Sequence, residues 1–380
     1  MTFFNDVPES VKLKHALSLP DGLSEPELLN DLENLSQKNI KAASNLGAGC
    51  YNHFIPSALK HIVGRSEFYT AYTPYQAEAS QGTLQVIYEY QSLICALTAM
   101  DVANASMYDG ATALAEAVLL ALRHTGRNKV LVSSALHPNH RKALKTYAAS
   151  AEFEIEEVPF DNKSGKTIDV GIDKSCAAYI ISQPNFFGCI EDVLSLADKA
   201  HAAGALFIVS VDPISLGILK PPGEYGADIV VGEGQSLGNA RNFGGPGLGI
   251  FTVKNTLIRQ IPGRLVGKTV DLEGKQGYTL TLQTREQHIR RERAPSNICS
   301  NEALCALAAC VYLSLMGKNG LKKVAEICLR KSNKLKKELG SPFSAPTFKE
   351  FVTKANKGIS LKQFYPELKD YFLVCSTELS

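Results

Sequence analysis

The sequence predicts an α/β fold, in which a three-layer domain with a mostly parallel sheet is followed by a small C-terminal α+β domain. Two observations support this fold class. Short apolar runs alternate with segments of helical periodicity between residues 129 and 253, and the runs are apolar at consecutive positions. Continuous apolar runs are typical of strands that helices cover on both faces of a parallel sheet.

The individual elements follow from local patterns. Helices are expected at 82–99 and at 109–122, where an Ala- and Leu-rich run begins after Asp109, a residue type that caps helices. Strands are expected at 129–133, 154–158, 178–182, 206–210, 229–231 and 249–253, with helices at 140–149 and 193–203 between them. Residues 255–300 are polar and predict loops. A helix at 301–316, a Lys-rich helical segment from 321 and a strand at 371–375 complete the chain.

The first 45 residues are expected to be mainly helical, with helix starts near Pro8 and Ser24 that acidic residues follow. Two later segments, 46–56 and 68–76, are rich in aromatic residues, the first also in glycine, so we expect them to lie against another surface. These features divide the chain into an N-terminal helical arm (1–65), a large α/β domain (66–320) and an abbreviated C-terminal domain (321–380).

The composition narrows the range of partners. The 380 residues include 40 basic and 38 acidic side chains that are well mixed, and the absence of a basic stripe argues against nucleic acid. No secretory signal opens the sequence, and no apolar stretch reaches the length that spans a bilayer, so no membrane partner is expected. Nine scattered cysteines without Cys-x-x-Cys spacing indicate reduced, buried thiols in a cytoplasm and no metal site.

Three residues are placed where an α/β sheet binds ligands, at the carboxyl ends of strands and beside helix N-termini. Thr112 lies in the first turn of helix 109–122, whose N–H groups could hold a phosphate. His137 follows strand 129–133 and could stack on a heteroaromatic cofactor, while Asp212 follows strand 206–210 and could pair with a pyridinium N–H. The alternatives are a plain helix cap, a loop histidine and a loop-capping aspartate.

The segment Val231–Gly249 is informative because of what it lacks. It follows an apolar run and ends in a glycine cluster, which resembles the place where pyridoxal-phosphate (PLP) enzymes of the aspartate-aminotransferase fold carry their Schiff-base lysine. No lysine occurs between Lys220 and Lys254, and Gln235 stands at the expected position. An amide cannot replace a nucleophilic amine. The sequence therefore indicates a cofactor pocket that has lost its cofactor.

Three longer strings, at 46–56, 72–82 and 292–301, resemble subunit 1 of the two-subunit glycine dehydrogenase (decarboxylating), the P-protein of the glycine cleavage system. The resemblance runs to about residue 330 and resumes at 365–378. It implies a fold-type I PLP-transferase architecture. It also implies an oxidoreductase component that is inactive alone and assembles with a homologous subunit 2, two of each chain.

In this resemblance, subunit 2 carries PLP on a lysine, and counting back from the shared glycine cluster places Gln235 at that lysine's position. The composite enzyme decarboxylates glycine and passes the aminomethyl group to the lipoyl arm of H-protein. The chain departs from the family pattern in a shorter stretch between Lys354 and Tyr365 and in stopping at Ser380.

Fold-type I active sites lie at dimer interfaces, so two segments are expected to reach the partner's PLP. Gly244, Gly245 and Gly247 could offer backbone N–H groups to its phosphate, because glycine permits a close approach. Tyr72, Tyr75 and Glu78 would line the substrate entry. The alternatives are a tight turn before strand 249–253 and ordinary packing at a subunit interface.

Other interpretations of the same residues remain open. The basic run at 290–293 could meet an acidic carrier such as H-protein, or be a solvated face. The chain could be a stand-alone PLP enzyme that uses Lys220 or Lys254, although neither follows a strand as the cofactor lysine should. It could also be a structural or regulatory pseudoenzyme.

Overall fold

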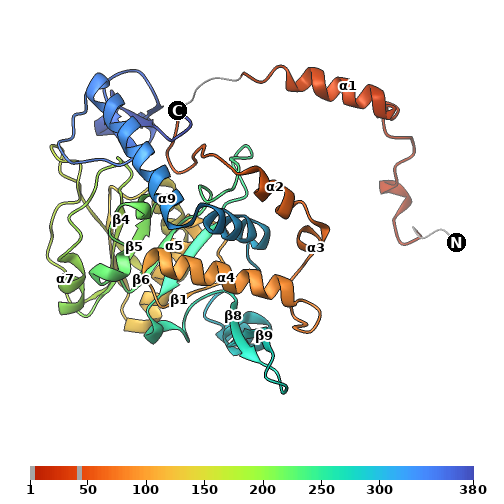
Figure 1. Cartoon of the computed structure of the whole chain (residues 1–380), viewed down its shortest axis with the longest axis horizontal. Coiled ribbons are helices and arrows are strands. Elements are labelled where there is room, and N and C mark those ends of the chain that lie inside the picture. Colours follow the sequence, from red (N-terminus) through yellow and green to blue (C-terminus); the bar gives the residue numbers. More distant parts are fainter. Residues whose placement is uncertain (1–4, 41–44) are drawn as a thin grey trace. The chain divides into compact units, whose positions relative to one another are not determined.

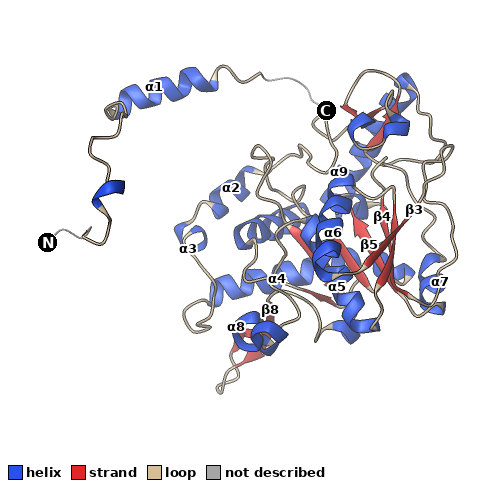
Figure 2. Ribbon diagram, turned by 180° about the vertical axis from the view of Figure 1, so that it is seen from behind, coloured by secondary structure: helices blue, strands red, loops and turns tan. Residues whose placement is uncertain are grey.

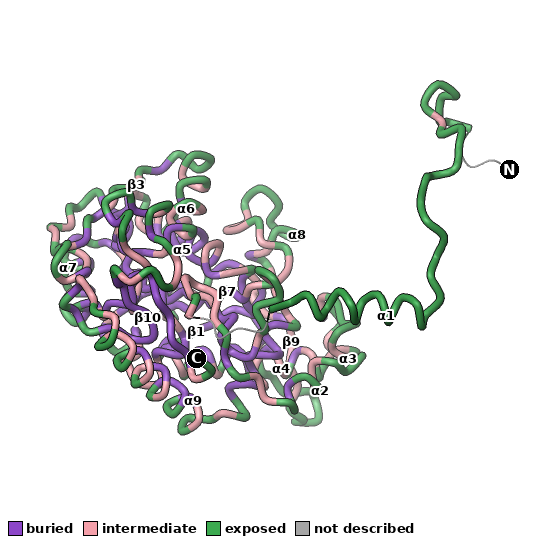
Figure 3. Tube along the Cα trace, turned by 90° about the horizontal axis from the view of Figure 1, so that it is seen from above, coloured by how far each residue is buried: buried purple, intermediate pink, exposed green. Residues whose placement is uncertain are grey.

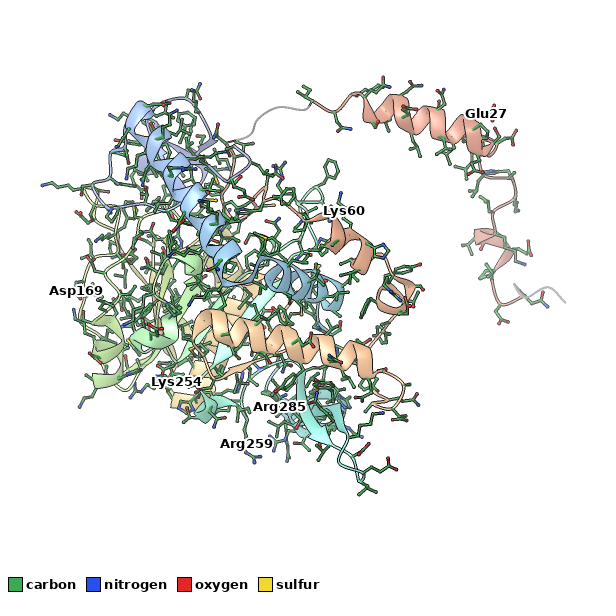
Figure 4. All side chains as sticks on the ribbon, viewed as in Figure 1. Glu27, Lys60, Asp169, Lys254, Arg259 and Arg285 are labelled. Carbon is green, nitrogen blue, oxygen red and sulfur yellow. The ribbon has the colours of Figure 1, made fainter. Side chains whose placement is uncertain are left out.

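The structure is a computed structural model that describes residues 5–40 and 45–380, and the chain divides into two compact units at Ser44/Asn45 (Figure 1). The first unit contains the short 3₁₀ helix η1 (Glu9–Val11) and the helix α1 (Glu25–Ser36). Helix α1 begins as predicted, because the N–H and hydroxyl of Ser24 donate to Glu27, labelled in Figure 4, at 2.9 and 2.6 Å.

The prediction of a mainly helical arm is wrong between residues 12 and 24, which form no helix. Pro20 and Gly22 interrupt this stretch, and both residue types disfavour helix interiors. The parts of the prediction at 1–4 and 41–44 lie outside the described residues.

The second unit is built on a sheet of seven strands in the order β1-β7-β6-β5-β4-β2-β3. The strands are β1 (Val102–Ala103), β2 (Lys129–Ser133), β3 (Glu154–Val158), β4 (Cys176–Gln183), β5 (Leu206–Val211), β6 (Ile229–Glu233) and β7 (Gly249–Val253). Strands β3, β2, β4, β5 and β6 are parallel, and β7 is antiparallel to both β6 and β1. The mostly parallel sheet confirms the predicted fold class.

Helices cover both faces of this sheet. The longer helices of this unit are α4 (Gln81–Thr98), α5 (Gly110–Thr125), α6 (Pro138–Ala151) and α9 (Ala303–Leu339). The short ones are α2 (Ser57–Val63), α3 (Ser66–Tyr69), α7 (Leu196–Ala202) and α8 (Gln287–Arg290). Figure 2 shows α5 and α6 together over the strands. Ile208 packs under α5, whereas its neighbours Phe207 and Val209 pack in the core that includes Ala200 of α7. Figure 3 shows the buried residues in purple, and β5 and β7 are buried at nearly every position. Because both faces of these strands are covered, their consecutive positions are apolar.

Helix α9 corrects one expectation. By length and composition it could cross a membrane, although no such stretch was expected from the sequence. Half of its most apolar window is buried, and Cys305, Ala309 and Tyr312 belong to a core that α4 shares. Gly317, with φ 57° and ψ −175°, breaks the helix close to the predicted end at 316. The helix therefore packs as a core element.

Two features of the fold were not expected from the sequence. Residues 255–300 contain a hairpin of β8 (Leu265–Val270) and β9 (Gln276–Thr281) where loops were predicted, and β1 is too short to leave a pattern.

The C-terminal part forms a sheet of β10 (Glu350–Thr353), β12 (Phe372–Cys375) and β11 (Ile359–Ser360). The predicted domain boundary at 320 falls inside α9, and the division into a large and a small domain stays a prediction.

Candidate functional site

The carboxyl ends of β2, β5 and β6 meet two segments that are distant in the sequence. One is the loop at 46–56, which precedes these strands, and the other is the start of β10, which follows them. Between them lies a cavity of about 70 Å³, which holds only a few water molecules. Two of the predicted residues, His137 and Asp212, line it. The remaining lining comes from Tyr51, Ser210, Glu233, Lys349, Glu350 and their neighbours.

Gln235 is buried just beyond β6, and its amide is fully engaged. The side-chain oxygen accepts the N–H of Tyr51 at 2.9 Å, and the side-chain nitrogen donates to the carbonyls of Tyr51 at 3.0 Å and Asn239 at 2.7 Å. An amide carries a donor and an acceptor together, so one side chain pairs with both the N–H and the carbonyl of Tyr51. Gln235 therefore fastens the loop at 46–56 to the segment that follows β6.

Asp212 is paired with a lysine that the sequence analysis did not single out. The ammonium of Lys349 lies 2.7 Å from its carboxylate and 3.4 Å from the ring centre of Tyr51, and the side chain of Lys349 is 1% exposed. Burial disfavours the charged amine, but Asp212 and nearby thiols hold the pKa of Lys349 above its ordinary value. The lysine is thus a charged partner of Asp212 and not a nucleophilic amine.

The charged network continues toward the C-terminal tail. Lys349 donates to Nε2 of His53 at 3.3 Å, and Nδ1 of His53 lies 2.7 Å from Glu378. Burial and the nearby ammonium lower the pKa of His53. Burial alone would raise the pKa of Glu378, but hydrogen bonds from His53 and from the Phe54 N–H bring it to about 2. Cys328 adds a thiol, so three possible metal ligands lie within 4.8 Å of one another. The adjacent ammonium disfavours a second cation there.

Glu350, the residue after Lys349, forms the other buried acidic contact. Its carboxylate accepts the N–H of Ala48 and the hydroxyl of Tyr51, both at 2.7 Å. Burial raises the pKa of Glu350 and raises that of Tyr51 well above its usual value, so the tyrosine stays protonated and donates. The start of β10 is thereby attached to the loop at 46–56.

His137 stacks on a neighbouring side chain. Its Nδ1 accepts the N–H of Asn139 at 3.1 Å, so Nε2 carries the proton and donates to the carbonyl of Ala48 at 2.8 Å. His140 stacks on the ring at 4.8 Å. Burial lowers the pKa of His137 and brings that of His140 to about 3, so both rings are neutral.

The N-terminus of α5 is the corner where a phosphate was considered. The hydroxyl and N–H of Thr112 are used by Asp109, whose carboxylate accepts the N–H at 2.7 Å. The N–H of Gly110, which has no partner within the helix, donates to the Glu233 carboxyl group at 3.0 Å. Two protein carboxylates therefore stand where an anion would be bound.

PLP, which the resemblance implies for the fold, does not fit these residues. Gln235 offers an amide and no amine. The Lys349 ammonium occupies Asp212, the acceptor that a pyridinium N–H would need. At the N-terminus of α5, protein carboxyl groups already accept the N–H groups of Gly110 and Thr112 that a phosphate would use. His137 and Asp212 line the cavity described above, whereas Thr112 and Gln235 do not, and a single cofactor pocket formed by all four residues stays a prediction. The polar side chains around the cavity are paired with other groups of the chain.

A second, open cavity of about 260 Å³ adjoins the first and shares Gly49, His137, His140 and Glu233 with it. Gly244, Gly245 and Gly247 line it together with Arg241. The N–H of Gly244 already donates to the Arg241 carbonyl at 2.9 Å. Within the part of the chain that the structure describes, Gly245 and Gly247 keep N–H groups without an acceptor.

Tyr72, Tyr75 and Glu78 lie on a separate surface and line neither cavity. Tyr72 is 79% exposed and Tyr75 is 53% exposed. The guanidinium of the buried Arg264 lies 5.7 Å from the ring centre of Tyr75, and His288 contacts the same ring edge-on. Arg264 and His288 thus hold the ring of Tyr75 in place, and the remaining surface of the ring faces solvent.

Sequence reasoning missed Tyr51, His53, Glu233, Lys349 and Glu350. A signal existed for the first two, because they belong to the unusual segment at 46–56. Glu233 was also visible as a charge at the end of an apolar strand. For Lys349 and Glu350 no local pattern indicates burial, since their environment is created by residues far away in the sequence.

The two alternative lysines lie elsewhere. Lys254, labelled in Figure 4, follows β7 and pairs at 2.7 Å with Asp228, which precedes β6 and so stands at the opposite edge of the sheet from Asp212. Lys220 is exposed in the connection between β5 and β6. Neither residue lines the cavities described above.

Comparisons with known proteins agree with this description. Residues 2–372 match the family described as glycine cleavage system P-protein. A probable glycine dehydrogenase (decarboxylating) subunit 1 from Desulforamulus reducens is 53% identical over 402 residues, covering 99% of this chain and 90% of the relative. A protein with the same name from Chlorobium phaeobacteroides is 57% identical over 359 residues, covering 91% and 81% of the two chains.

Solved structures give the same result. The crystal structure of a glycine decarboxylase (P-protein) of the glycine cleavage system, in inhibitor-bound form, matches with a TM-score of 0.92 at 43% identity, covering 99% of this chain and 90% of the other. A sphingosine-1-phosphate lyase from Burkholderia pseudomallei matches with a TM-score of 0.63 at 14% identity, covering 98% and 90%. The latter likeness concerns the fold alone.

Proposed function

The chain belongs to the glycine cleavage system P-protein family, as a glycine dehydrogenase (decarboxylating) subunit 1, and we propose that it serves as the half of the enzyme that does not hold the cofactor. The family has the fold of PLP-dependent enzymes. In our proposal PLP is bound by a homologous, lysine-bearing subunit 2, and this chain completes the partner's active site. The assembly contains two of each chain and works in the cytoplasm.

One observation carries the proposal. The amide of Gln235 holds the Tyr51 backbone through both its donor and its acceptor, and in our proposal this residue stands at the position of the cofactor lysine. The ion pair between Asp212 and Lys349 supports the same conclusion from the other side of the pocket. These charged and amide groups are already used to hold segments of the chain together, so none is available to bind a cofactor. We therefore assign the chemistry to another chain.

We assign two surfaces to the partner's site. The N–H groups of Gly245 and Gly247, at the rim of the open cavity beside Gly244, would donate to the phosphate of the partner's PLP. Tyr72, Tyr75 and Glu78 would line the entry for glycine, where their exposure leaves them available to a second chain. The product of this composite site would be an aminomethyl group that the lipoyl arm of H-protein accepts.

The experiment is reconstitution with subunit 2. The chain and subunit 2 are copurified, and the exchange of labelled bicarbonate into the carboxyl group of glycine is measured with lipoylated H-protein present. We expect exchange with the pair and little with either chain alone. Copurification without any gain over subunit 2 alone would contradict the proposal and indicate a structural or regulatory pseudoenzyme.

A further inference from the structure

The loop between β6 and β7, residues 234–248, has a base and a tip with opposite properties. At its base, one carboxylate accepts three backbone N–H groups: Glu233 binds the N–H of Gln235 and of Leu248 at 2.9 Å each and that of Gly110 at 3.0 Å. Gln235 and Leu248 are the two ends of the loop, and Gly110 begins α5. The carboxylate thus pins both ends of the loop to the sheet and to a helix N-terminus.

The packing around this carboxylate leaves little freedom. A Cβ atom added to Gly247 would lie 2.9 Å from the side chain of Asp109 and 3.1 Å from the carboxylate of Glu233. A Cβ atom added to Gly110 would lie 3.0 Å from the backbone nitrogen of Glu233. The base of the loop is therefore closed by direct backbone packing around one internal anion.

The tip of the loop is exposed and strained. Phe243 is fully exposed, and both Asn242 and Phe243 have left-handed backbones with φ 41° and 55°. A bulky residue in that region is disfavoured, and such strain persists only where the surroundings impose it. An aromatic side chain in water next to a strained backbone gains nothing within the isolated chain.

We propose that loop 234–248 is a preformed docking element for the lysine-bearing partner subunit, with Phe243 as its anchor and Glu233 as the positioning residue that holds its shape. The inference rests on the proposed function and deepens it, because the same loop carries Gly245 and Gly247. A buried aromatic anchor contributes strongly to binding, and a rigid loop loses little entropy when it docks. The partner must accordingly offer an apolar pocket for the phenyl ring.

The anchor is tested through the affinity of the two subunits. Phe243→Ala is compared with Leu272→Ala, since Leu272 is equally exposed at the tip of the β8–β9 hairpin. We expect the first variant to raise the Kd for subunit 2 at least about ten-fold and the second to change it less than about two-fold. Equal effects of the two variants, or no effect of Phe243→Ala, would overturn the assignment of the anchor.

The positioning role is tested with Glu233→Gln, which keeps the shape of the side chain but removes the charge. Its matched control is Glu191→Gln, another buried carboxylate that accepts a backbone N–H, from Thr167 at 3.0 Å, and lies outside both cavities. At pH 8, trypsin should cut after the exposed Arg241 at least about ten-fold faster in the first variant, because the amide nitrogen that replaces one carboxylate oxygen cannot accept a backbone N–H. The control should be cut at the wild-type rate.

Measurements on the assembled enzyme separate this role from a general loss of stability. In the exchange assay, Glu233→Gln should bind subunit 2 more weakly, and saturating amounts of the variant should restore most of the exchange rate. Unchanged cleavage at Arg241 together with unchanged subunit affinity would overturn the positioning role. Failure of the wild-type chain to support exchange would instead count against the proposed function.

Discussion

At the scale of single residues, the site is defined by pairs of groups that satisfy each other. Lys349 and Asp212 neutralise one another in a largely buried ion pair, and Gln235 and Tyr51 exchange donor and acceptor. In our proposal each pair stands where a PLP enzyme needs an unpaired group. These pairings make specific predictions about what a single substitution would do.

Lys349→Met should strongly destabilise the chain. It leaves the carboxylate of Asp212 largely buried without its cation, and breaking such a pair costs about 3–5 kcal/mol. Urea unfolding of the chain alone measures this loss. The double variant Lys349→Met with Asp212→Leu should recover most of it, because no lone charge remains. A loss below about 1 kcal/mol for the single variant would show that the ion pair is not buried as described.

Gln235→Lys should not create a PLP site. Asp212 would stay paired with Lys349, and the N–H groups at the start of α5 would stay bound to carboxyl groups. The Tyr51 backbone would lose its partner at a cost of about 1–3 kcal/mol. The measurement is absorbance near the visible range with added PLP, followed by borohydride reduction and peptide mapping. Stable trapping of PLP at position 235 would contradict the account.

Glu233 should make the stability of the chain depend on pH. Burial raises its pKa from 4.5 to about 7, although three N–H groups oppose the shift. Between these values the folded chain keeps a proton that the unfolded chain releases, so stability falls as the pH rises from 4.5 to 7, by at most about 3 kcal/mol.

The comparison with Glu233→Gln isolates this effect. Asp109, Cys50 and Arg241 also face the carboxylate, and they are present in both proteins. Unfolding free energies at pH 5 and pH 8 should therefore show the variant gaining stability relative to the wild type at the higher pH. A difference that does not change with pH, or that changes in the other direction, would contradict the raised pKa.

At the scale of elements, the sheet and its helices were predictable because buried parallel strands leave continuous apolar runs. The position of Asp212 and Gln235 followed, since each comes directly after such a run. Lys349 was not predictable, because its burial depends on β10 reaching Asp212 across 137 positions of sequence. The hairpin β8–β9 was missed because only Leu265, Val266 and Leu280 of its strand residues are buried and apolar, too few to leave an alternating pattern.

The break in α9 was visible at Gly317, and it allows a prediction. The φ of 57° with ψ of −175° is accessible almost only to glycine, so Gly317→Ala should cost about 1–3 kcal/mol. Gly320 has ordinary helical geometry, and Gly320→Ala displaces only the side chain of Met316, which would lie 3.2 Å from the new methyl group, so the substitution should change the stability by less than about 1 kcal/mol. Thermal and urea unfolding of both variants decide this, and equal effects would mean that the helix is not broken at Gly317.

At the scale of the whole molecule, the chain keeps the fold of a PLP enzyme while its own pocket serves to hold segments together. The loop at 46–56, the end of β6 and the start of β10 meet through Gln235, Glu350 and Lys349. The exposed groups, Phe243 among them, lie outside this pocket. This arrangement is why we propose that the chain contributes to catalysis through surfaces that it offers to a partner.

The most direct measurement of this claim is the location of PLP in the complex with subunit 2. The complex is reduced with borohydride, the bound PLP is counted, and the modified lysine is identified by mass spectrometry of peptides. The account predicts one PLP for each pair of chains, with every modified lysine on subunit 2. A modified lysine in this chain, at Lys349 or anywhere else, would contradict it.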